Sequence, residues 1–273
     1  MTIPAHTSGP GSTSSPESAS SMENVPPTFH LPAVTHALVS LLQTIVVALF
    51  LLTFILQPFL IPSESMERTL LVGDFILVNK QVYAPSGPLS RWVLPYRDIR
   101  RGDIVFFFHS QPPFLVKRVV GLPGDRLRIH DGRVTVNGVP LSEPYAAFEP
   151  APSNPFRDNF PPRLYTDPEV DPSWWRQMQS LTRDGLLVVP QGEYFVLGDN
   201  RNHSVDSRFW GFVGRRQIAA RPLVIYFSLD RPSSTDIQAN AAQASDDRLG
   251  HDRCLSCRLL GFARWRRIFR VVH

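Results

Sequence analysis

The sequence predicts a single membrane-spanning helix near the N-terminus, followed by a mainly β domain. Three observations support this fold class. Residues 33–58 are apolar and carry no charged side chain, whereas the residues after them form short runs rich in Val, Ile and Phe. Gly, Pro or Asp bounds each run, as is typical of strands. Between two runs stands Asp131-Gly132, whose residues can adopt the positive φ angles of a tight hairpin.

Composition narrows the classes of function. The formal net charge is +4, and the aromatic residues do not interleave with a basic patch, so a nucleic-acid-binding groove is not expected. The hydrophobic fraction of 43% is ample for a core. The two cysteines, Cys254 and Cys257, allow no disulfide framework and no cysteine-rich metal site. One local disulfide and two free thiols both remain open.

The N-terminal part divides into a polar tail and an apolar anchor. Residues 1–32 are dominated by Ser, Pro, Thr and Gly, a composition typical of disordered segments. We expect residues 33–61 to form a transmembrane anchor, because about 25 apolar residues span a hydrocarbon core of roughly 30 Å as a helix. Pro58 should end that helix. No Lys or Arg precedes the segment and no Ala-x-Ala follows it, which favours an uncleaved anchor over a signal peptide. A buried helix of a soluble protein is the alternative.

The charges that flank the anchor give a weak indication of orientation. No Lys or Arg lies before it, while Arg68 and Lys80 follow it. The positive-inside rule alone would therefore place the C-terminal bulk of the chain on the cytoplasmic side. That rule loses force for a large exported domain.

Residues 62–230 are expected to form the β domain. Its clearest hairpin turns at Asp131-Gly132, and Asn137-Gly138 then turns the chain again. Residues 140–172 contain nine prolines, which remove donors from a strand ladder, so we expect an insertion that runs over the surface. The expected strands cover residues 75–80, 104–108, 114–120, 126–130, 133–136, 193–197 and 222–227.

Two further segments leave alternatives open. Asp171-Pro172 has the form of an N-cap and a first-turn proline, so we expect a short helix there. Its residues Trp174 and Trp175 could pack on the core or contact a membrane. The C-terminal segment, residues 231–273, is first polar and then basic and apolar. It could form an interfacial helix against anionic lipid or an amphipathic piece packed on the domain.

Ser63 and Ser65 lie just after the apolar segment and are the candidates for a nucleophile and its helper. A serine hydroxyl needs a neighbouring base to become a good nucleophile. Of the eight histidines, only His109 and His203 fall near such a site, and neither stands in a recognisable triad motif. A buried lysine is the other candidate base, because loss of hydration lowers the pKa of its ammonium group.

Lys117 is the lysine that fits this requirement. In its expected strand, Leu115, Lys117 and Val119 share one face, while Arg118 points to the other. Lys117 should then face an apolar surface and Arg118 should face solvent. A lone lysine in a strand is more often an edge residue that prevents aggregation, so the pattern alone does not assign it to catalysis.

The loop 198–211 is dense in polar side chains directly after an expected strand. It could be a structural loop held by its own hydrogen bonds. In the functional interpretation, Ser204 positions the lysine amine while Asp206 and Arg208 brace the loop.

Four motifs, in this order, resemble the boxes of bacterial type I signal peptidases. The resemblance covers most of residues 58–230 and implies a fold with a two-part antiparallel β-sheet catalytic domain. In one departure, Arg68 stands where the family commonly has proline. The motifs are Pro62-Ser-Glu-Ser-Met66 with Thr69-Leu70 and Gly73-Asp74, then Arg101-Gly-Asp-Ile-Val-Phe106, Lys117-Arg-Val-Val-Gly-Leu-Pro-Gly-Asp125, and Gly198-Asp-Asn-Arg through Asp206-Ser-Arg208.

The resemblance also implies roles for individual residues. Ser65 would be the nucleophile and Lys117 the general base of a Ser-Lys dyad. The Ser63 hydroxyl and the Ser65 backbone N–H would form the oxyanion hole. The residues that support the site would be Ser204, Asp206 and Arg208.

The implied activity is that of a membrane-bound serine endopeptidase that removes N-terminal signal peptides from exported preproteins. The catalytic domain would lie at the outer face of the plasma membrane, in contact with lipid, as a monomer without metal or organic cofactor. The substrate would bind as an extended strand, with small residues one and three positions before the cut. Activity should rise with pH, because only the free lysine amine is a base.

Two other functions are compatible with parts of this pattern. One is a catalytically silent, membrane-anchored β binding module that retains the same scaffold. The other is a self-cleaving Ser-Lys repressor, which would need a helix-turn-helix where this chain has its apolar segment.

Overall fold

The computed structural model describes residues 33–83, 97–109, 111–230 and 263–272. The polar tail 1–32, the first part of the C-terminal segment, and Cys254 and Cys257 therefore lie outside the described residues. Within them, the chain is mainly β, with two antiparallel sheets and one long apolar helix, which confirms the expected fold class.

The apolar helix is α1 (Ala33–Phe50), which continues into a π-helical turn (Leu51–Ile55). Val34–Ile55 is a stretch of 22 residues that is long and apolar enough to cross a membrane, and its most apolar part is not buried inside the protein. The helix ends three residues before Pro58, because β1 (Leu56–Leu60) already belongs to the sheet. The segment expected as anchor thus includes a strand.

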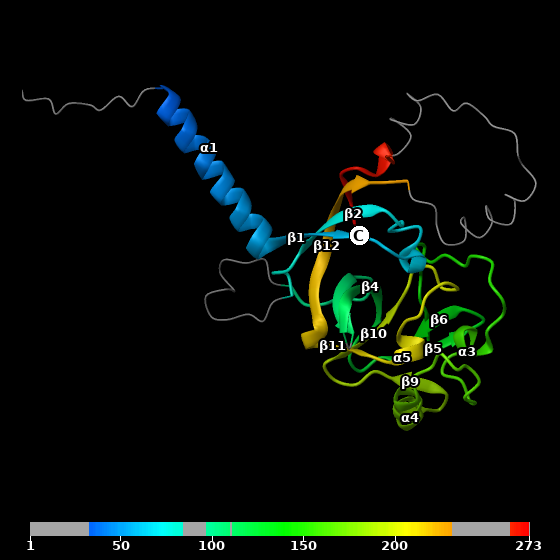
Figure 1. The fold of residues 1–273 in the computed structure, drawn as a ribbon. Helices are drawn as coiled ribbons and strands as arrows, with labels where there is room; N and C mark the ends of the chain where they lie inside the picture. The colour runs from blue at the N-terminus through cyan, green and yellow to red at the C-terminus, as the bar shows by residue number, and fades with distance from the viewer. Residues whose placement is uncertain (1–32, 84–96, 110, 231–262, 273) are drawn as a thin grey trace, which may run out of the picture. The chain divides into compact units, whose positions relative to one another are not determined.

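The larger sheet carries both ends of the β domain. Its strands run in the order β1-β2-β12-β3-β4-β10-β11, and β13 (Arg270–Val271) pairs with β12 beside that path (Figure 1). Each pair of neighbours is antiparallel. Proline cannot donate to a ladder, and Pro58 accordingly lies in the edge strand β1. The other strands are β2 (Asp74–Asn79), β3 (Ile104–His109), β4 (Gln111–Gly121), β10 (Glu193–Leu197), β11 (Val213–Gly214) and β12 (Ile218–Ser228).

The smaller sheet is built around the predicted hairpin. Its order is β7-β6-β5-β9-β8, and Asp131 and Gly132 join β5 to β6 with φ angles of 48° and 74°. Asn137 and Gly138 form the next turn, with φ angles of 53° and 82°, as expected. The strands are β5 (Arg126–His130), β6 (Arg133–Val136), β7 (Val139–Pro140), β8 (Thr182–Arg183) and β9 (Leu186–Val188).

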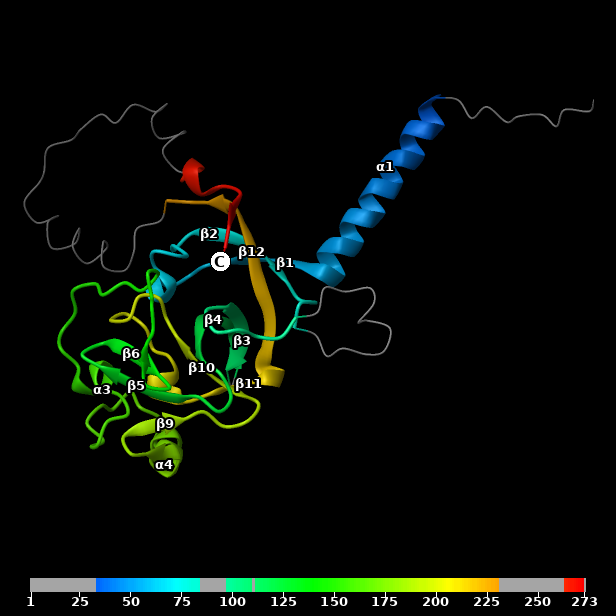
Figure 2. The same ribbon diagram turned by 180° about the vertical axis from the view of Figure 1, so that it is seen from behind.

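The proline-rich insertion does not only run over the surface, as was expected, but also contributes to the core. It contains α3 (Pro155–Asp158), and α4 (Pro172–Leu181) follows at its end and lies beside β9 in both views (Figures 1 and 2). The Asp171 side chain accepts hydrogen bonds from two N–H groups of the first turn of α4, which confirms the predicted cap. Phe156, Phe160 and Trp174 are buried in the core cluster of the smaller sheet. The insertion therefore supplies aromatic side chains to the core, which its proline content did not indicate.

The described end of the C-terminal segment packs on the larger sheet. Residues 263–272 form a short 3₁₀ turn (Trp265–Arg267) and β13. Arg267 makes a two-pronged ion pair with Asp74, at 2.6 Å and 3.1 Å, and also donates to the carbonyl of Thr69. Asp74 is fully buried and accepts in addition from Ser228 and from the backbone of Leu71. Of the two alternatives for the basic segment, these residues adopt the packed one.

Replacing Arg267 by alanine is expected to destabilise the domain by about 3 kcal/mol or more, because it leaves the buried Asp74 carboxylate without its cation. Chemical denaturation followed by tryptophan fluorescence measures this free energy of unfolding. Arg266→Ala is the matched control, since Arg266 is the adjacent, exposed arginine. Equal stability of the two variants would mean that the Arg267–Asp74 pair contributes little.

Candidate active site

The two serines lie in the turn between β1 and β2. The 3₁₀ turn Glu64–Met66 contains Ser65, and the Oγ atoms of Ser63 and Ser65 are 3.4 Å apart. Met66 is buried and anchors the turn in the core below the larger sheet. Backbone hydrogen bonds from Ile61 N to Asp74 O and from Gly73 N to Ile61 O close the loop at its base. Ser65 is thus held half-buried on a fixed turn.

Lys117 lies in β4 and is only 4% exposed. Burial, with a smaller contribution from the nearby Arg208, lowers the pKa of its ammonium group to about 8, although Asp206 and Asp199 oppose the shift. Strand β4 packs against the turn that carries Ser65. A large fraction of Lys117 is therefore the neutral amine near pH 8, the form that can accept a proton.

The polar loop after β10 is built around Asp206. Its carboxylate accepts from Ser204 Oγ at 2.8 Å, from Gly198 N at 3.0 Å, and from two nitrogens of Arg208 at 2.8 Å each. Burial by itself would raise the pKa of Asp206, but Arg208, together with Lys117, holds it below the usual value. Asp206 is consequently a buried carboxylate anion that faces both cations.

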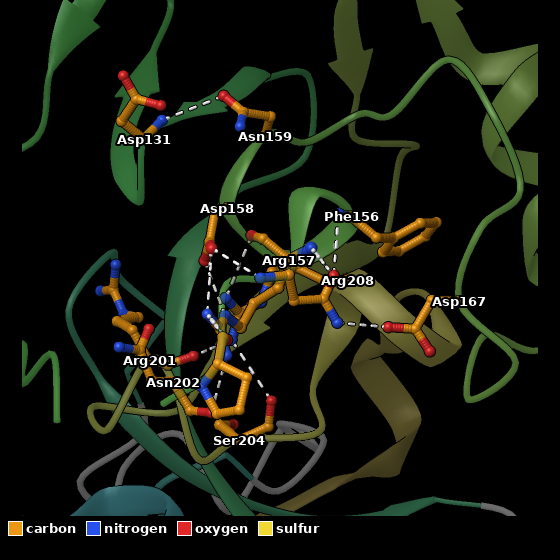
Figure 3. A network of polar contacts seen from close by, with 12 residues as sticks. Asp131, Phe156, Arg157, Asp158, Asn159, Asp167, Arg201, Asn202, Ser204 and Arg208 are labelled. Atoms are coloured by element: carbon orange, nitrogen blue, oxygen red, sulfur yellow. Dashed lines mark hydrogen bonds and ion pairs between the residues drawn. The ribbon is translucent and has the colours of Figure 1, made fainter. Parts of the chain in front are cut away.

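A second network fixes the far side of this loop (Figure 3). Arg208 Nη2 donates to the carbonyl of Arg201 at 2.8 Å, and Arg157 Nη1 donates to the carbonyl of Asn202 at 3.3 Å. Arg157 comes from α3 in the insertion. The insertion thus braces the loop that carries Ser204 and Asp206.

Gly198 and Asn200 bring the loop against the serine turn. Asn200 N donates to the carbonyl of Ser65 at 3.1 Å. A Cβ atom at position 198 would overlap both Ser204 Oγ and the Ser65 carbonyl oxygen, so only glycine fits between them. Ser65 and Ser204 therefore lie within a side chain's width of each other, although they are 139 positions apart in sequence (204 − 65).

The structure brings most, though not all, of the predicted partners into contact. Ser63 lies beside Ser65, while Ser204, Asp206 and Arg208 form one network next to Lys117. Among the described residues, no hydrogen bond links Lys117 to Ser65 or to Ser204, whose hydroxyl donates to Asp206. The dyad geometry thus remains a prediction.

The expectation that Arg118 faces solvent is wrong. Arg118 is 4% exposed, and it donates to the two carboxylate oxygens of Asp199 at 2.8 Å and 2.7 Å. Its guanidinium stacks on the ring of Tyr145, 3.9 Å from the centroid. Strand alternation placed Arg118 correctly on the opposite face, but the insertion covers that face, which alternation cannot indicate.

Asp199 lies beside the candidate site, although the sequence did not predict a separate role for it. It is fully buried and accepts from Thr69 Oγ1 at 2.6 Å as well as from Arg118. It thereby connects the serine turn with the strand of Lys117. Its position beside Asn200 in the polar loop was the available signal.

The two candidate histidines make other contacts. The ring of His109 stacks on Trp210 with centroids 4.3 Å apart, and His203 Nε2 lies 3.4 Å from the carbonyl of Pro150. Neither forms a hydrogen bond with Ser63 or Ser65 within the described part of the chain. The described residues also include no group of three His, Cys, Asp or Glu that could hold a metal ion.

Arg68 stands where the family described above commonly has proline, and its backbone conformation excludes proline at this position. Its φ angle is 76°, a left-handed conformation that the proline ring forbids. Its Nη1 donates to the carbonyl of Ala146 at 2.9 Å, so the side chain ties the serine turn to the insertion. The backbone after Ser65 is thus shaped for a residue other than proline.

Comparisons with known proteins show which family the chain resembles. Residues 34–227 match the model of a family described as signal peptidase, peptidase S26. The chain is 34% identical over 216 residues to signal peptidase I of Pseudomonas aeruginosa, covering 72% of this chain and 74% of the relative. It is also 34% identical over 242 residues to signal peptidase I of Aquifex aeolicus, covering 76% and 90%.

The chain is also similar to proteins of solved structure. A crystal structure of a signal peptidase I from Enterococcus faecalis is 31% identical in sequence, covers 46% of this chain and 97% of that chain, and gives a TM-score of 0.34.

Proposed function

Because the chain belongs to the signal peptidase family, peptidase S26, and is a serine endopeptidase, we propose that it cleaves with a Ser65–Lys117 dyad while anchored in a membrane. Membership of the family supports the removal of signal peptides from preproteins. One arrangement carries the proposal of the dyad. A buried lysine with a pKa of about 8 lies next to the loop that contacts the carbonyl of Ser65.

In the proposed reaction, the neutral Lys117 amine takes the proton of the Ser65 hydroxyl as Oγ attacks the scissile carbonyl carbon. The oxyanion that forms is stabilised by the Ser65 backbone N–H and the Ser63 hydroxyl. The Lys117 ammonium then protonates the leaving amine as the peptide bond breaks. Water attacks the resulting acyl ester, with Lys117 again as the base, and releases Ser65.

The residues around Asp206 have a supporting role in this proposal. The Ser204 hydroxyl donates its hydrogen bond to Asp206, so its oxygen can accept a hydrogen bond from the Lys117 amine. This second hydrogen bond would orient the amine. The Asp206–Arg208 pair, with both side chains at most 2% exposed, keeps that carboxylate in place. The low exposure of the group also prevents water from hydrating the ammonium form.

The substrate is proposed to bind as an extended segment. β1 is an edge strand of the larger sheet and leads directly to Ser63 and Ser65. An added strand gains backbone hydrogen bonds at such an edge, and shallow pockets next to it would admit only small side chains. We therefore propose small residues one and three positions before the cut.

The proposed location is the plasma membrane, with the catalytic domain on the outer face. The stretch Val34–Ile55 would be the single anchor, which leaves Ser65 ten residues beyond its end (65 − 55 = 10) and hence near the lipid surface. The chain would act as a monomer in contact with lipid. The flanking charges do not oppose this orientation strongly, because a large domain can be exported despite them.

Cleavage of a preprotein in detergent, with the N-terminus of the product sequenced, tests this function. Wild type and Ser180→Ala, which changes an exposed serine of α4, should release one product that begins just after the signal peptide. Ser65→Ala should release none, because no other oxygen takes its place. Equal cleavage by Ser65→Ala would instead assign the nucleophile elsewhere, and no cleavage by wild type would favour the silent binding module.

A further inference from the structure

A cavity lies next to the residues that follow Ser65 and is lined by Arg118 of β4. It is a cavity of about 500 Å³ that Arg68, Arg118 and Arg270 line together. These residues come from three distant parts of the chain: the turn after Ser65, strand β4, and the C-terminal strand β13. Three arginines thus line the cavity, and no Asp or Glu is among its lining residues.

Among the described residues, carboxylates neutralise only part of the positive charge that lines this cavity. Asp199 pairs with Arg118 from outside the lining. Neither Arg68 nor Arg270 forms an ion pair with a carboxylate of the described residues. Two cations that face one concave space without a counter-charge favour an anion between them.

Two of the three guanidinium groups are held in place before any ligand binds. Arg118 is fixed by Asp199 and by its stacking on Tyr145. Arg68 is fixed by its bond to the carbonyl of Ala146, which occupies Nη1 and leaves other donors of the fork available. Fixed guanidinium forks match the oxygens of a phosphate group and lose little entropy on binding.

Part of the cavity lining is apolar. It consists of Ile225, Val271 and Val272, where β13 meets β12. The lining therefore suits a ligand that carries an anionic group next to an apolar part. A free phosphate would use the arginines alone, whereas a phospholipid would use the arginines for its headgroup and the apolar residues for its acyl part.

We propose that this cavity binds a phosphate-bearing ligand between Arg68 and Arg270. The site goes beyond the proposed peptidase function, since neither arginine belongs to the Ser65–Lys117 machinery. Thr69 also lines the cavity and donates to Asp199, so the ligand would lie one contact away from the network that holds the serine turn.

Calorimetric titration of the full chain in a neutral detergent and phosphate-free buffer tests the proposal. The probes are inorganic phosphate, dihexanoyl-phosphatidylglycerol below its micelle concentration, and dihexanoylglycerol as the uncharged lipid, all at one ionic strength. Saturable binding of either phosphate probe is expected. Binding of both identifies phosphate itself as the ligand group, and binding of the phospholipid alone identifies a lipid headgroup.

Arg68→Gln and Arg270→Gln should each weaken that binding by about tenfold or more, because a hydrogen bond to a charged group is lost. Arg266→Gln, an exposed arginine of the same segment outside the lining, should change it by less than about twofold. The Ser65→Ala variant should bind as wild type does, which separates this site from the peptidase reaction. Thermal unfolding without ligand checks that each variant is folded. Of the two substitutions, Arg270→Gln is expected to disturb the fold less, because Arg270 is exposed on a short strand.

Three results would overturn the proposal. The first is the absence of saturable binding by either phosphate probe. The second is equal binding of the uncharged lipid, which would mean that the apolar part of the lining alone is responsible. The third is an equal loss of affinity in Arg266→Gln, which would indicate a diffuse basic surface.

Discussion

Lys117→Met is expected to lower kcat by about 10⁴-fold or more with little change in KM, because removal of the base leaves the Ser65 hydroxyl un-ionised. Methionine approximates the length of the buried lysine stem without its amine, so the strand β4 should keep its packing. Initial rates of preprotein cleavage at saturating substrate and alkaline pH measure the effect. At alkaline pH the wild-type amine is fully neutral, so the difference in rate between wild type and Lys117→Met is then largest.

The composition of the chain provides an unusually close control for this experiment. It contains two lysines, Lys80 and Lys117, and all its other cationic side chains at high pH are arginines. Lys80 donates to the carbonyl of Thr53, which belongs to the π-helical turn before β1. Lys80→Met should therefore retain full activity. Lys117→Arg should be as inactive as Lys117→Met, since a guanidinium stays protonated. A Lys117→Met variant with more than about a tenth of wild-type activity would exclude lysine as the base.

The sequence predicted those parts of the fold that depend on local pattern. The hairpin at Asp131-Gly132 requires positive φ angles, which the residue types at these two positions predict by themselves. The cap at Asp171 likewise acts within one helical turn. The face of Lys117 likewise follows from alternation in β4. Each of these features is decided by residues fewer than five positions apart, so a single sequence contains the information.

Other features depend on what lies across the fold. Arg118 was expected in solvent, yet it is buried because Asp199 and Tyr145, 81 and 27 positions away in sequence (199 − 118 and 145 − 118), cover it. Strand β1 was assigned to the anchor because its residues are apolar, and only pairing with β2 shows that they belong to the sheet. Local propensity cannot distinguish an apolar strand from the end of an apolar helix.

The site was predicted less from physics than from the order of its motifs. Serines, a strand lysine and a polar loop each have common structural explanations, and the family resemblance connected them. The structure adds the physical links, namely the contact of Asn200 with Ser65 and the restriction at Gly198. It also adds Arg267, whose bond to Thr69 could not be inferred from a segment that could equally have lain on a membrane.

The pH dependence of cleavage should show the titration of Lys117. With a pKa of about 8 for the free enzyme, the neutral amine makes up about one part in a hundred at pH 6 and about nine tenths at pH 9. We therefore expect kcat/KM to rise about a hundredfold between these values and then to level off. The sign follows from the role of the base: protonation below pH 8 removes it, and no loss is expected above.

The Asp206→Asn variant tests whether the pH dependence of cleavage arises from Lys117 and not from another titrating group. The Asp206 carboxylate raises the pKa of Lys117, against the larger effect of burial, so its neutralisation should move the midpoint of kcat/KM to lower pH. The maximal rate should fall at the same time, because Arg208 and Ser204 lose their common partner. Lys80→Met should leave the midpoint unchanged. A profile that is flat from pH 6 to 9, or one that Asp206→Asn shifts to higher pH, would contradict a neutral Lys117 amine as the base that activates Ser65.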